Sequence, residues 1–498
     1  MQLDAAHCGG FIRPVSLSKS LFVAGTQCHK LLWWKVHEPL AKELQPDKVL
    51  QDRFDQGAQV GGLARDLFPS GELIDAIGRS HEDRIRLTEE ALRGRHPIFE
   101  AAFEAHGVYV KVDILLNDGD GWRLIEVKSA SSQKAEHVLD AAVQLFVVAA
   151  SGVAVTAVEI MHLNKEFSHP DQGPLLVRAD VTDAARALLP RIPPMIASQL
   201  TVMDGPLPTV AIGEHCADPR DCPFMDRCWP QNSDHISKLY NVGVKRASAH
   251  MRAGVHTVWD LPPKKKPSFT EQRQLKAMKE GRLIVEPTLS KALEEFGGRL
   301  GFLDFETISR AVPVWPGMAP WGPAPAQFSY HQADGKGNYT HAKFLAEGPE
   351  DCRPELARQM LEATATSDRI VTYSAYEKTQ IRALQQSVPS LRAELEGLEH
   401  KLIDLLPVVR DNVYHPDFQG SFSIKYVLSP MVPALTYHDL VIVNGLVASV
   451  EIARLLFVAQ RIADEERDRV RKDLLAYCER DTWAMVKLLE RLRELAVT

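Results

Sequence analysis

Residues 107–128 read GVYVKVDILLNDGDGWRLIEVK, and this stretch decides the fold of the first half of the chain. Residues 107–116 are rich in β-branched side chains in alternation, which predicts a strand. The Asn, Asp and Gly residues of 117–121 favour a turn, and residues 122–128 predict the returning strand. Helical spacing follows over residues 136–150. The sequence therefore predicts a β-hairpin followed by a helix.

Charged residues on this hairpin are of the types that hold metal ions and orient water. Asp113 lies on the first strand, and Glu126 and Lys128 share one face of the second because strand side chains alternate. Two carboxylates can hold Mg²⁺ or Mn²⁺, and a lysine can orient water beside a phosphate. Asp140 and Gln144 follow one turn apart on the predicted helix. An ordinary surface hairpin is the alternative interpretation, which these flanking residues weaken.

Length and composition limit the number of domains and the class of protein. The 498 residues predict two to four domains, and 45% hydrophobic with 25% charged residues is typical of a globular protein. No apolar run reaches the roughly 18 residues of a membrane-spanning helix, and the N-terminus lacks a signal-peptide pattern. We therefore expect a cytoplasmic protein. The net charge of −7 does not exclude a nucleic-acid enzyme, because such an enzyme needs only a local basic strip.

Cysteines form a second pattern. Cys216, Cys222 and Cys228 are each separated by five residues, and Cys28 lies far upstream. Four thiolates can bind zinc or a [4Fe–4S] cluster. The five-residue spacing is wider than that of most zinc sites and favours the cluster. Zinc, and simple packing of three buried cysteines, remain the alternatives.

A third pattern lies in the last 200 residues. Residues 303–307 read LDFET and predict a strand with Asp304 and Glu306 on one face. Far downstream, Tyr477 and Asp481 are four residues apart on a predicted helix and share its face. Carboxylates from separate elements can hold the two ions, about 4 Å apart, that hydrolyse phosphodiesters. The tyrosine would position the attacking water.

A further carboxylate belongs to this third pattern. Glu377 follows a short strand predicted at residues 369–373, at the start of a helix. Asp404 is a spare acidic candidate. A chance match of these short motifs is one alternative, and an RNase H-like fold without activity is the other.

The hairpin residues resemble the PD-(D/E)xK nuclease superfamily, specifically its RecB-like branch. Asp113, Glu126 and Lys128 match the core motif, and Gln144 matches the glutamine motif that follows it. The resemblance implies that Asp113 and Glu126 hold Mg²⁺ or Mn²⁺. The chain departs from the branch in one respect. The upstream helix reads GAQVG over residues 57–61 and lacks the histidine ligand that many RecB-like members have.

The cysteines resemble those of the iron–sulfur RecB-like nucleases, which include the CRISPR-associated adaptation exonuclease and AddB-type helicase–nuclease subunits. In these proteins one cysteine precedes the nuclease core and three follow it. Cys28 and the later Cys216, Cys222 and Cys228 bracket the hairpin in the same way. The resemblance implies a structural [4Fe–4S] cluster that staples the two ends of the domain together.

The C-terminal pattern resembles the DnaQ-like 3′–5′ exonucleases of the RNase H superfamily. Asp304 and Glu306 match the first motif, and Tyr477 and Asp481 match the third, Y-x-x-x-D motif. The second motif normally supplies an aspartate, whereas Glu377 is one methylene longer. The resemblance implies metal ligands at Asp304, Glu306 and Asp481.

Together these resemblances imply an α/β protein with a restriction-endonuclease-like domain at 1–232, a helical connector at 233–298 that includes a candidate helix-hairpin-helix, and an RNase H-like exonuclease domain at 299–498. The pairing is similar to a bacterial family found among phage-defence and CRISPR-neighbouring genes, which implies protein partners there. We expect a metal-dependent nuclease, with DNA favoured over RNA. The alternative is an inactive module that binds nucleic acid or docks a partner.

Overall fold

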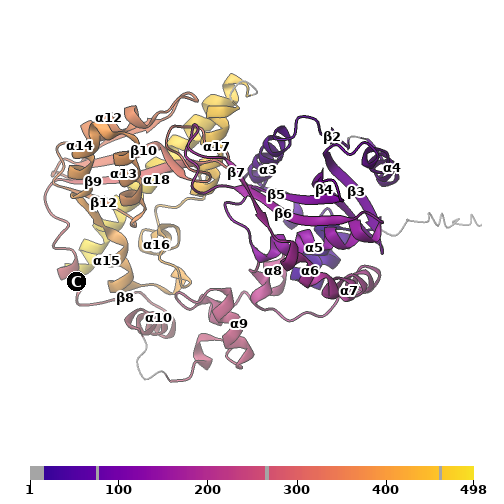
Figure 1. The fold of residues 1–498 in the computed structure, drawn as a ribbon. Helices are drawn as coiled ribbons and strands as arrows, with labels where there is room; N and C mark the ends of the chain where they lie inside the picture. Colours follow the sequence, from indigo (N-terminus) through magenta and orange to yellow (C-terminus); the bar gives the residue numbers. More distant parts are fainter. Residues whose placement is uncertain (1–15, 75–77, 264–267, 459–461, 498) are drawn as a thin grey trace, which may run out of the picture. The chain divides into compact units, whose positions relative to one another are not determined.

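The chain divides into two compact units (Figure 1). The computed structural model describes residues 16–74, 78–263, 268–458 and 462–497. The N-terminal unit contains Met1–Pro46, Gly57–Asn164 and Leu175–Trp229. The C-terminal unit contains Asp47–Gln56, Lys165–Pro174 and Pro230–Thr498. Within the described ranges, no helix is long and apolar enough to cross a bilayer.

A seven-stranded mixed sheet forms the centre of the N-terminal unit. Its strands run in the order β2-β3-β4-β5-β6-β7, and β1 pairs with β4. Their bounds are β1 Leu17–Ser18, β2 Glu72–Leu73, β3 Ile98–Ala105, β4 Val108–Asn117, β5 Trp122–Lys128, β6 Val155–Leu163 and β7 Leu176–Asp180. β4 is antiparallel to β3 and β5, whereas β5 is parallel to β6.

The predicted hairpin and helix are confirmed as β4, β5 and α5 (Ala135–Ala150). The turn between the strands contains Gly119 at φ 98°, a conformation that favours glycine. α5 packs against the sheet through buried residues that include Ala141 and Val143. Such burial, at about 25 cal/mol per Å² of apolar surface, fixes the helix beside the strand ends.

Further helices complete the N-terminal unit. They are α1 Lys19–Gln27, α2 His29–His37, α4 His81–Leu92, α6 Thr182–Leu188, α7 Ile192–Asp204 and α8 Met225–Cys228. α3 (Lys48–Asp66) covers the helix-like spacing near residues 55–68, and its residues are divided between the two units. Ala64 of α3 packs with Phe99, Ile114 and Ile125 of the sheet.

The C-terminal unit is built on a five-stranded mixed sheet in the order β11-β10-β9-β12-β13. Their bounds are β9 Leu300–Ser309, β10 Pro323–Ala333, β11 Tyr339–Leu345, β12 Arg369–Thr372 and β13 Leu402–Asp404. β9 is antiparallel to β10 and parallel to β12. Both units therefore have the predicted α/β character, each with its own mixed sheet.

Helices cover both faces of this second sheet. The bounds of the larger ones are α12 Arg353–Thr364, α13 Tyr376–Ser387, α14 Arg392–Glu399, α15 Leu405–Asn412, α16 Ile424–Met431, α17 Gly445–Phe457 and α18 Asp464–Val497. Leu303 and Phe305 of β9 pack in the core made with α12, α13 and α14. Ile308 packs instead with α17 and α18. Because strand side chains alternate, Asp304 and Glu306 lie on the face that α17 and α18 cover.

Residues 230–298 belong to the C-terminal unit. They form η4 Ile236–Lys238, α9 Val244–Arg252, η5 Val258–Asp260, α10 Phe269–Glu280, β8 Ile284–Val285 and α11 Leu289–Ala292. Ala277 of α10 and Ile284 of β8 are buried in the same core as Phe302 of β9. β8 also pairs with β14 (Val413–Tyr414). The segment expected to be a connector thus packs into a core of this unit, and the proposed three-domain division stays a prediction.

Candidate active sites

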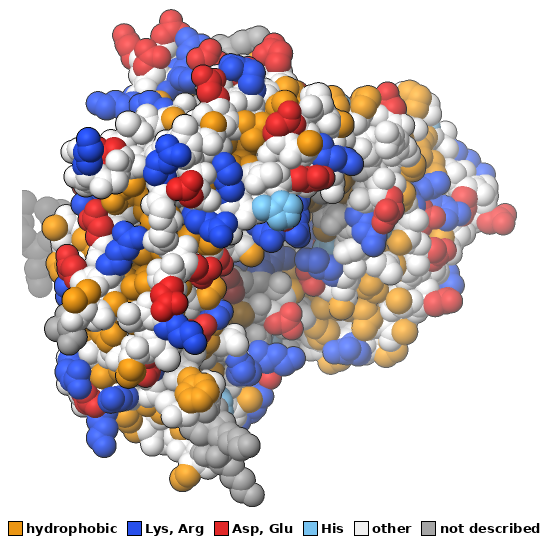
Figure 2. Space-filling view, turned by 90° about the vertical axis from the view of Figure 1, so that its left-hand side faces the viewer, with side chains coloured by type: hydrophobic (Ala, Val, Ile, Leu, Met, Phe, Trp, Pro, Cys, Tyr) orange, Lys and Arg blue, Asp and Glu red, His pale blue; other side chains and the backbone are white. Residues whose placement is uncertain are grey.

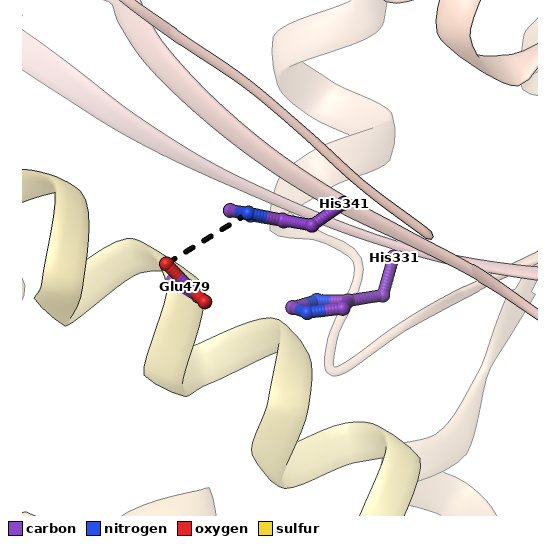
Figure 3. A group of neighbouring side chains, drawn as sticks. All are labelled: His331, His341 and Glu479. Carbon is purple, nitrogen blue, oxygen red and sulfur yellow. Dashed lines mark ion pairs between the residues drawn. The ribbon is translucent and has the colours of Figure 1, made fainter. Parts of the chain in front are cut away.

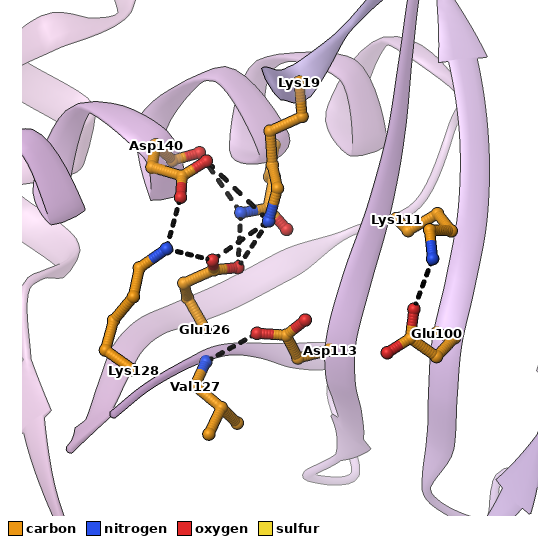
Figure 4. A network of polar contacts seen from close by, with 9 residues as sticks. Lys19, Glu100, Lys111, Asp113, Glu126, Val127, Lys128 and Asp140 are labelled. Carbon is orange, nitrogen blue, oxygen red and sulfur yellow. Dashed lines mark hydrogen bonds and ion pairs between the residues drawn. The ribbon is translucent and has the colours of Figure 1, made fainter. Parts of the chain in front are cut away.

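The hairpin residues of the N-terminal unit meet around Glu126 (Figure 4). The Glu126 carboxylate accepts hydrogen bonds from Lys128 Nζ at 2.6 Å, from Gln144 Nε2 at 2.7 Å and from Lys19 Nζ at 2.9 and 3.1 Å. Lys128 also donates to Asp140 Oδ2 at 2.5 Å. Four of these five side chains come from β5 and α5, and the fifth, Lys19, begins α1.

Asp113 lies on the other strand of the hairpin. Its Oδ2 accepts a hydrogen bond from the Val127 backbone N–H at 2.7 Å. Burial, reinforced by the Glu126 charge, raises the pKa of Asp113 to about 7. Burial also opposes ionisation of Glu126, but Lys19 and Lys128 outweigh it and hold the Glu126 pKa below its ordinary value. One buried carboxylate is therefore neutralised by lysines, and its neighbour favours a proton or another cation.

Lys19 is a site residue that the sequence analysis missed. It is 107 positions from Glu126 in sequence and belongs to no motif with it. β1 brings it to the site, because Ser18 pairs with Tyr109 of β4 and α1 starts at the next residue. Lys19 also lies 3.7 Å from Asp140. A two-residue strand gives no periodic signal, so its pairing could not be found from the sequence.

Glu100, a neighbouring carboxylate on β3, has its own partner. Lys111 Nζ lies 2.7 Å from Glu100 Oε2, and both side chains are partly exposed. The pair is drawn beside the main cluster in Figure 4. Because both side chains reach solvent, this ion pair can be compared with the buried pairs around Glu126.

In the C-terminal unit, Asp304, Glu306 and Asp481 converge. One carboxylate oxygen from each lies within 4.8 Å of the others. They line a pocket of about 510 Å³ together with Tyr477 of α18, Tyr376 of α13 and other residues, several of them from β9 and α17. β9 supplies the first two acids and α18 the third, as the residue order predicted. This separation of at most 4.8 Å is suitable for divalent cations, which take several oxygen ligands.

Glu377, at the start of α13, is buried and only 4% exposed. No described residue hydrogen-bonds to its Oε2. Burial raises the pKa of Glu377 to about 7, and the charges of Asp404 and Asp481 act in the same direction. Asp404, the spare candidate, caps α15 by accepting the Leu406 N–H at 2.9 Å. Its carboxylate is thus engaged in helix capping, while that of Glu377 has an unsatisfied oxygen.

The three acids that line the pocket are also destabilised as anions. Burial raises the pKa of Asp304 well above its ordinary value, and the charges of Asp481 and Glu306 add to the effect. Burial likewise raises the pKa of Glu306 and of Asp481. Buried carboxylates this close cannot all ionise without cations among them. The arrangement can therefore bind positive charge.

Two tyrosines and a lysine adjoin these acids. Lys425 Nζ donates to the Tyr477 hydroxyl at 2.9 Å and to the Val443 carbonyl at 2.6 Å. The Tyr437 hydroxyl donates to Asp481. Lys425 is the second residue of α16, and Tyr437 lies in a loop; neither belongs to a motif that the sequence predicted. Burial raises the pKa of Tyr477, so this hydroxyl stays protonated.

The four patterned cysteines line one small pocket. Cys28, Cys216, Cys222 and Cys228 border it, and Trp34 and Phe224 pack beside them. Burial raises the pKa of Cys222 to about 11. No three sulfur atoms of these described cysteines lie within 4.8 Å of one another. A single tetrahedral zinc with Zn–S bonds near 2.3 Å needs sulfurs only about 3.8 Å apart.

Charged side chains of both signs are interspersed on the surface. On the face in Figure 2, Lys and Arg side chains form scattered small groups beside Asp and Glu. Among the described residues on that face, no broad basic stripe is present. This distribution agrees with the net charge of −7.

Comparisons with known proteins bear on both units. Residues 10–229 match the family described as the PD-(D/E)XK nuclease superfamily, and residues 301–423 match a domain of unknown function, DUF2779. No curated protein matches the chain. One solved structure, the family B DNA polymerase from the hyperthermophilic archaeon Pyrobaculum calidifontis, is similar at 13% identity and a TM-score of 0.25.

That similarity covers 40% of this chain and 27% of the polymerase chain, so it spans about a quarter of the polymerase. The family match covers the hairpin, α5 and the cysteines described above. Residues 10–229 of this chain therefore form a PD-(D/E)XK nuclease superfamily domain.

Proposed function

We propose that this protein is a nuclease in which the C-terminal unit removes nucleotides from 3′ ends with divalent cations. Asp304, Glu306 and Asp481 hold the ions, with Glu377 as a further ligand. The observation that carries the proposal is the convergence of the Asp304, Glu306 and Asp481 carboxylates in one pocket. DNA is the favoured substrate, because the RecB-like resemblance of the other unit points to DNA.

The residues suit Mg²⁺ or Mn²⁺. All the ligands are carboxylate oxygens, which these cations prefer. Glu377 Oε2 is buried and accepts no hydrogen bond from a described residue, so a cation would satisfy it. When bound, divalent ions activate water and stabilise charge on the phosphate.

The remaining groups have distinct tasks. The Tyr477 hydroxyl, held by Lys425, donates a hydrogen bond that orients the attacking water. Lys425 offers positive charge to the phosphate, because its own hydrogen bonds go to a tyrosine hydroxyl and a carbonyl. Tyr437 fixes the position of Asp481. Positioning of this kind accounts for a large share of catalysis in phosphodiester hydrolysis.

The N-terminal unit supplies a second proposed site. A PD-(D/E)XK nuclease domain suggests a metal-dependent nuclease, commonly with Mg²⁺, and implies nucleic acid as its substrate. Asp113 and Glu126 are the proposed metal ligands, with Lys128 and Gln144 as catalytic residues. A cation that binds Glu126 must displace Lys19, which occupies both carboxylate oxygens.

The Lys19 contacts also favour a second function for this unit. If Lys19 and Lys128 together neutralise Glu126 and Asp140 permanently, the domain binds nucleic acid or a partner without cutting. The absence of a histidine at residues 57–61 agrees with this alternative.

We also propose that the four cysteines bind a [4Fe–4S] cluster. The proposal is supported by their shared pocket, which brings Cys28 beside Cys216, Cys222 and Cys228, and by the resemblance to the iron–sulfur nucleases. Anaerobically purified protein should contain about four iron and four sulfide per chain. Absence of both iron and sulfide from the purified protein would contradict this proposal.

The nuclease assay uses end-labelled single- and double-stranded DNA and RNA with Mg²⁺ or Mn²⁺. The proteins compared are the wild type, Asp304→Ala and Lys128→Ala. We expect Asp304→Ala to abolish 3′ shortening and Lys128→Ala to remove a separate cleavage pattern. Cleavage that Lys128→Ala leaves unchanged would favour the binding module for the N-terminal unit. No cleavage by wild type with either metal would contradict the proposed nuclease function.

A further inference from the structure

Two histidines and a glutamate form a second group of metal-type ligands in the C-terminal unit. One ligand atom from each of His331, His341 and Glu479 lies within 4.8 Å of the others. The three side chains come from β10, β11 and α18 (Figure 3). None of them belongs to the pocket around Asp304 and Asp481.

The fold itself places these ligands together. His331 and His341 are directly opposed in the antiparallel pair of β10 and β11, so their side chains share one face. Their rings stack at 4.4 Å between centroids. α18 packs across this face, and Glu479 Oε2 lies 3.7 Å from His341 Nδ1. Three separate backbone elements therefore fix the three ligands.

Hydroxyl groups hold one nitrogen of each imidazole. His331 Nδ1 lies 2.8 Å from Thr482 Oγ1, and His341 Nε2 lies 2.9 Å from Ser329 Oγ. Ser329 Oγ and Thr482 Oγ1 are themselves 2.8 Å apart. Metal-binding histidines are typically held in this way, with the second ring nitrogen hydrogen-bonded and the first directed at the ion. The hydroxyl network thus leaves one nitrogen per ring for a ligand.

The burial of the three side chains is also suitable for binding a metal ion. His331 is 5% exposed, whereas the Glu479 side chain is 47% exposed. An ion there would have one open side for water. Two imidazoles and one carboxylate with an open position suit Zn²⁺ and similar transition-metal ions more than Mg²⁺, which prefers oxygen alone.

We propose that His331, His341 and Glu479 bind one transition-metal ion, of which Zn²⁺ is the representative, and that this ion fastens α18 to β10 and β11. The site goes beyond the proposed nuclease function, because it holds no residue of the acidic pocket. It has a consequence for that pocket, since the same helix carries Tyr477 and Asp481. A clamp at Glu479 would restrict movement of α18 relative to the sheet.

Zinc binding by the full-length protein tests the site. Metal-free protein is dialysed against Zn²⁺ with saturating Mg²⁺, and bound zinc is measured for wild type, His341→Gln and Glu479→Gln. His415→Gln is the matched control, because His415 has a nearby carboxylate, Asp417, but no third ligand among the described residues. Any metal bound by the cysteines is common to all four proteins and cancels in the comparison.

We expect wild type and His415→Gln to bind one zinc more than the two ligand variants, or to bind that zinc at least about tenfold more tightly. Zinc should also raise the melting temperature of wild type but not of Glu479→Gln. Because Glu479 is half exposed, its change to glutamine should leave the fold intact in chelator, which the metal-free melting temperature checks. Equal zinc content and equal zinc-induced stabilisation in all four proteins would overturn the proposal.

Discussion

The two acidic clusters differ in where their positive charge comes from. In the N-terminal unit, Lys19 and Lys128 bind Glu126 directly. In the C-terminal unit, the carboxylates of Asp304, Glu306 and Asp481 lie together, and Lys425 hydrogen-bonds to Tyr477 and a carbonyl instead. In the N-terminal unit, lysines of the same chain therefore pair directly with the buried acid, whereas no described lysine or arginine forms an ion pair with the three acids of the C-terminal unit.

This difference between the two clusters predicts different affinities for divalent ions. A carboxylate that already has a buried lysine partner gives up that pair before it takes a metal, and the exchange costs free energy. Carboxylates without such a partner can bind a metal ion without this cost. We therefore expect the C-terminal site to bind divalent ions more tightly than the N-terminal site.

The largest expected effect comes from removing one acid of the C-terminal cluster. Asp304→Asn should lower the rate of 3′ shortening on the order of 10³-fold, because about 4 kcal/mol of metal-derived stabilisation is lost. Single-turnover rates on end-labelled DNA measure it. Asp417→Asn, an acid-to-amide change at an exposed position, should have the wild-type rate. Wild-type rates in Asp304→Asn would place the activity elsewhere.

The second largest expected effect comes from removing Lys19, the lysine that pairs with Glu126 in the N-terminal unit. Lys19→Met should destabilise the metal-free protein by about 3 to 4 kcal/mol, because Glu126 then loses a buried partner. Urea unfolding with and without Mg²⁺ measures the change, and Mg²⁺ should restore part of it. Lys111→Met is the control, since its pair with Glu100 is solvated and should contribute less than about 1 kcal/mol. Equal destabilisation by Lys19→Met and Lys111→Met would contradict a special role of the buried Lys19–Glu126 pair.

The pH dependence of the C-terminal unit should follow Glu377. Its folded pKa of about 7 lies above the ordinary 4.5, so the folded state holds the proton more tightly. Metal-free protein should lose about 3 kcal/mol of stability from this group as pH rises from about 4.5 to about 7. Urea unfolding across this range compares wild type with Glu377→Gln, which should lack the loss. Parallel pH profiles for the two proteins would contradict the assignment.

The smallest expected effect concerns the tyrosine of the third motif. Tyr477→Phe should slow the turnover of the exonuclease reaction about tenfold to a hundredfold, because the water loses its positioning hydroxyl while the acids remain. Its melting temperature should stay close to that of wild type. Tyr426→Phe is the control, as Tyr426 is half exposed and outside the pocket lining. A change in substrate affinity with unchanged turnover would indicate a binding role instead.

Local patterns predicted the parts of each site that lie within one or two elements. The hairpin with Asp113 and Glu126, its following helix, and the strand with Asp304 and Glu306 all have periodic signals. Lys19 had none, because it reaches Glu126 through the pairing of a two-residue strand. The opposition of His331 and His341 depended on the register of two strands that the sequence analysis did not predict.

Binding of Mn²⁺ to the full-length protein tests the comparison between the two clusters most directly. Titration of metal-free wild type, Asp304→Asn and Glu126→Gln, followed by electron paramagnetic resonance of free Mn²⁺, counts the bound ions and ranks their affinity. We predict that Asp304→Asn loses the tightest-bound Mn²⁺ and that Glu126→Gln retains it. Loss of the tightest-bound ion from Glu126→Gln, with none lost from Asp304→Asn, would contradict the account.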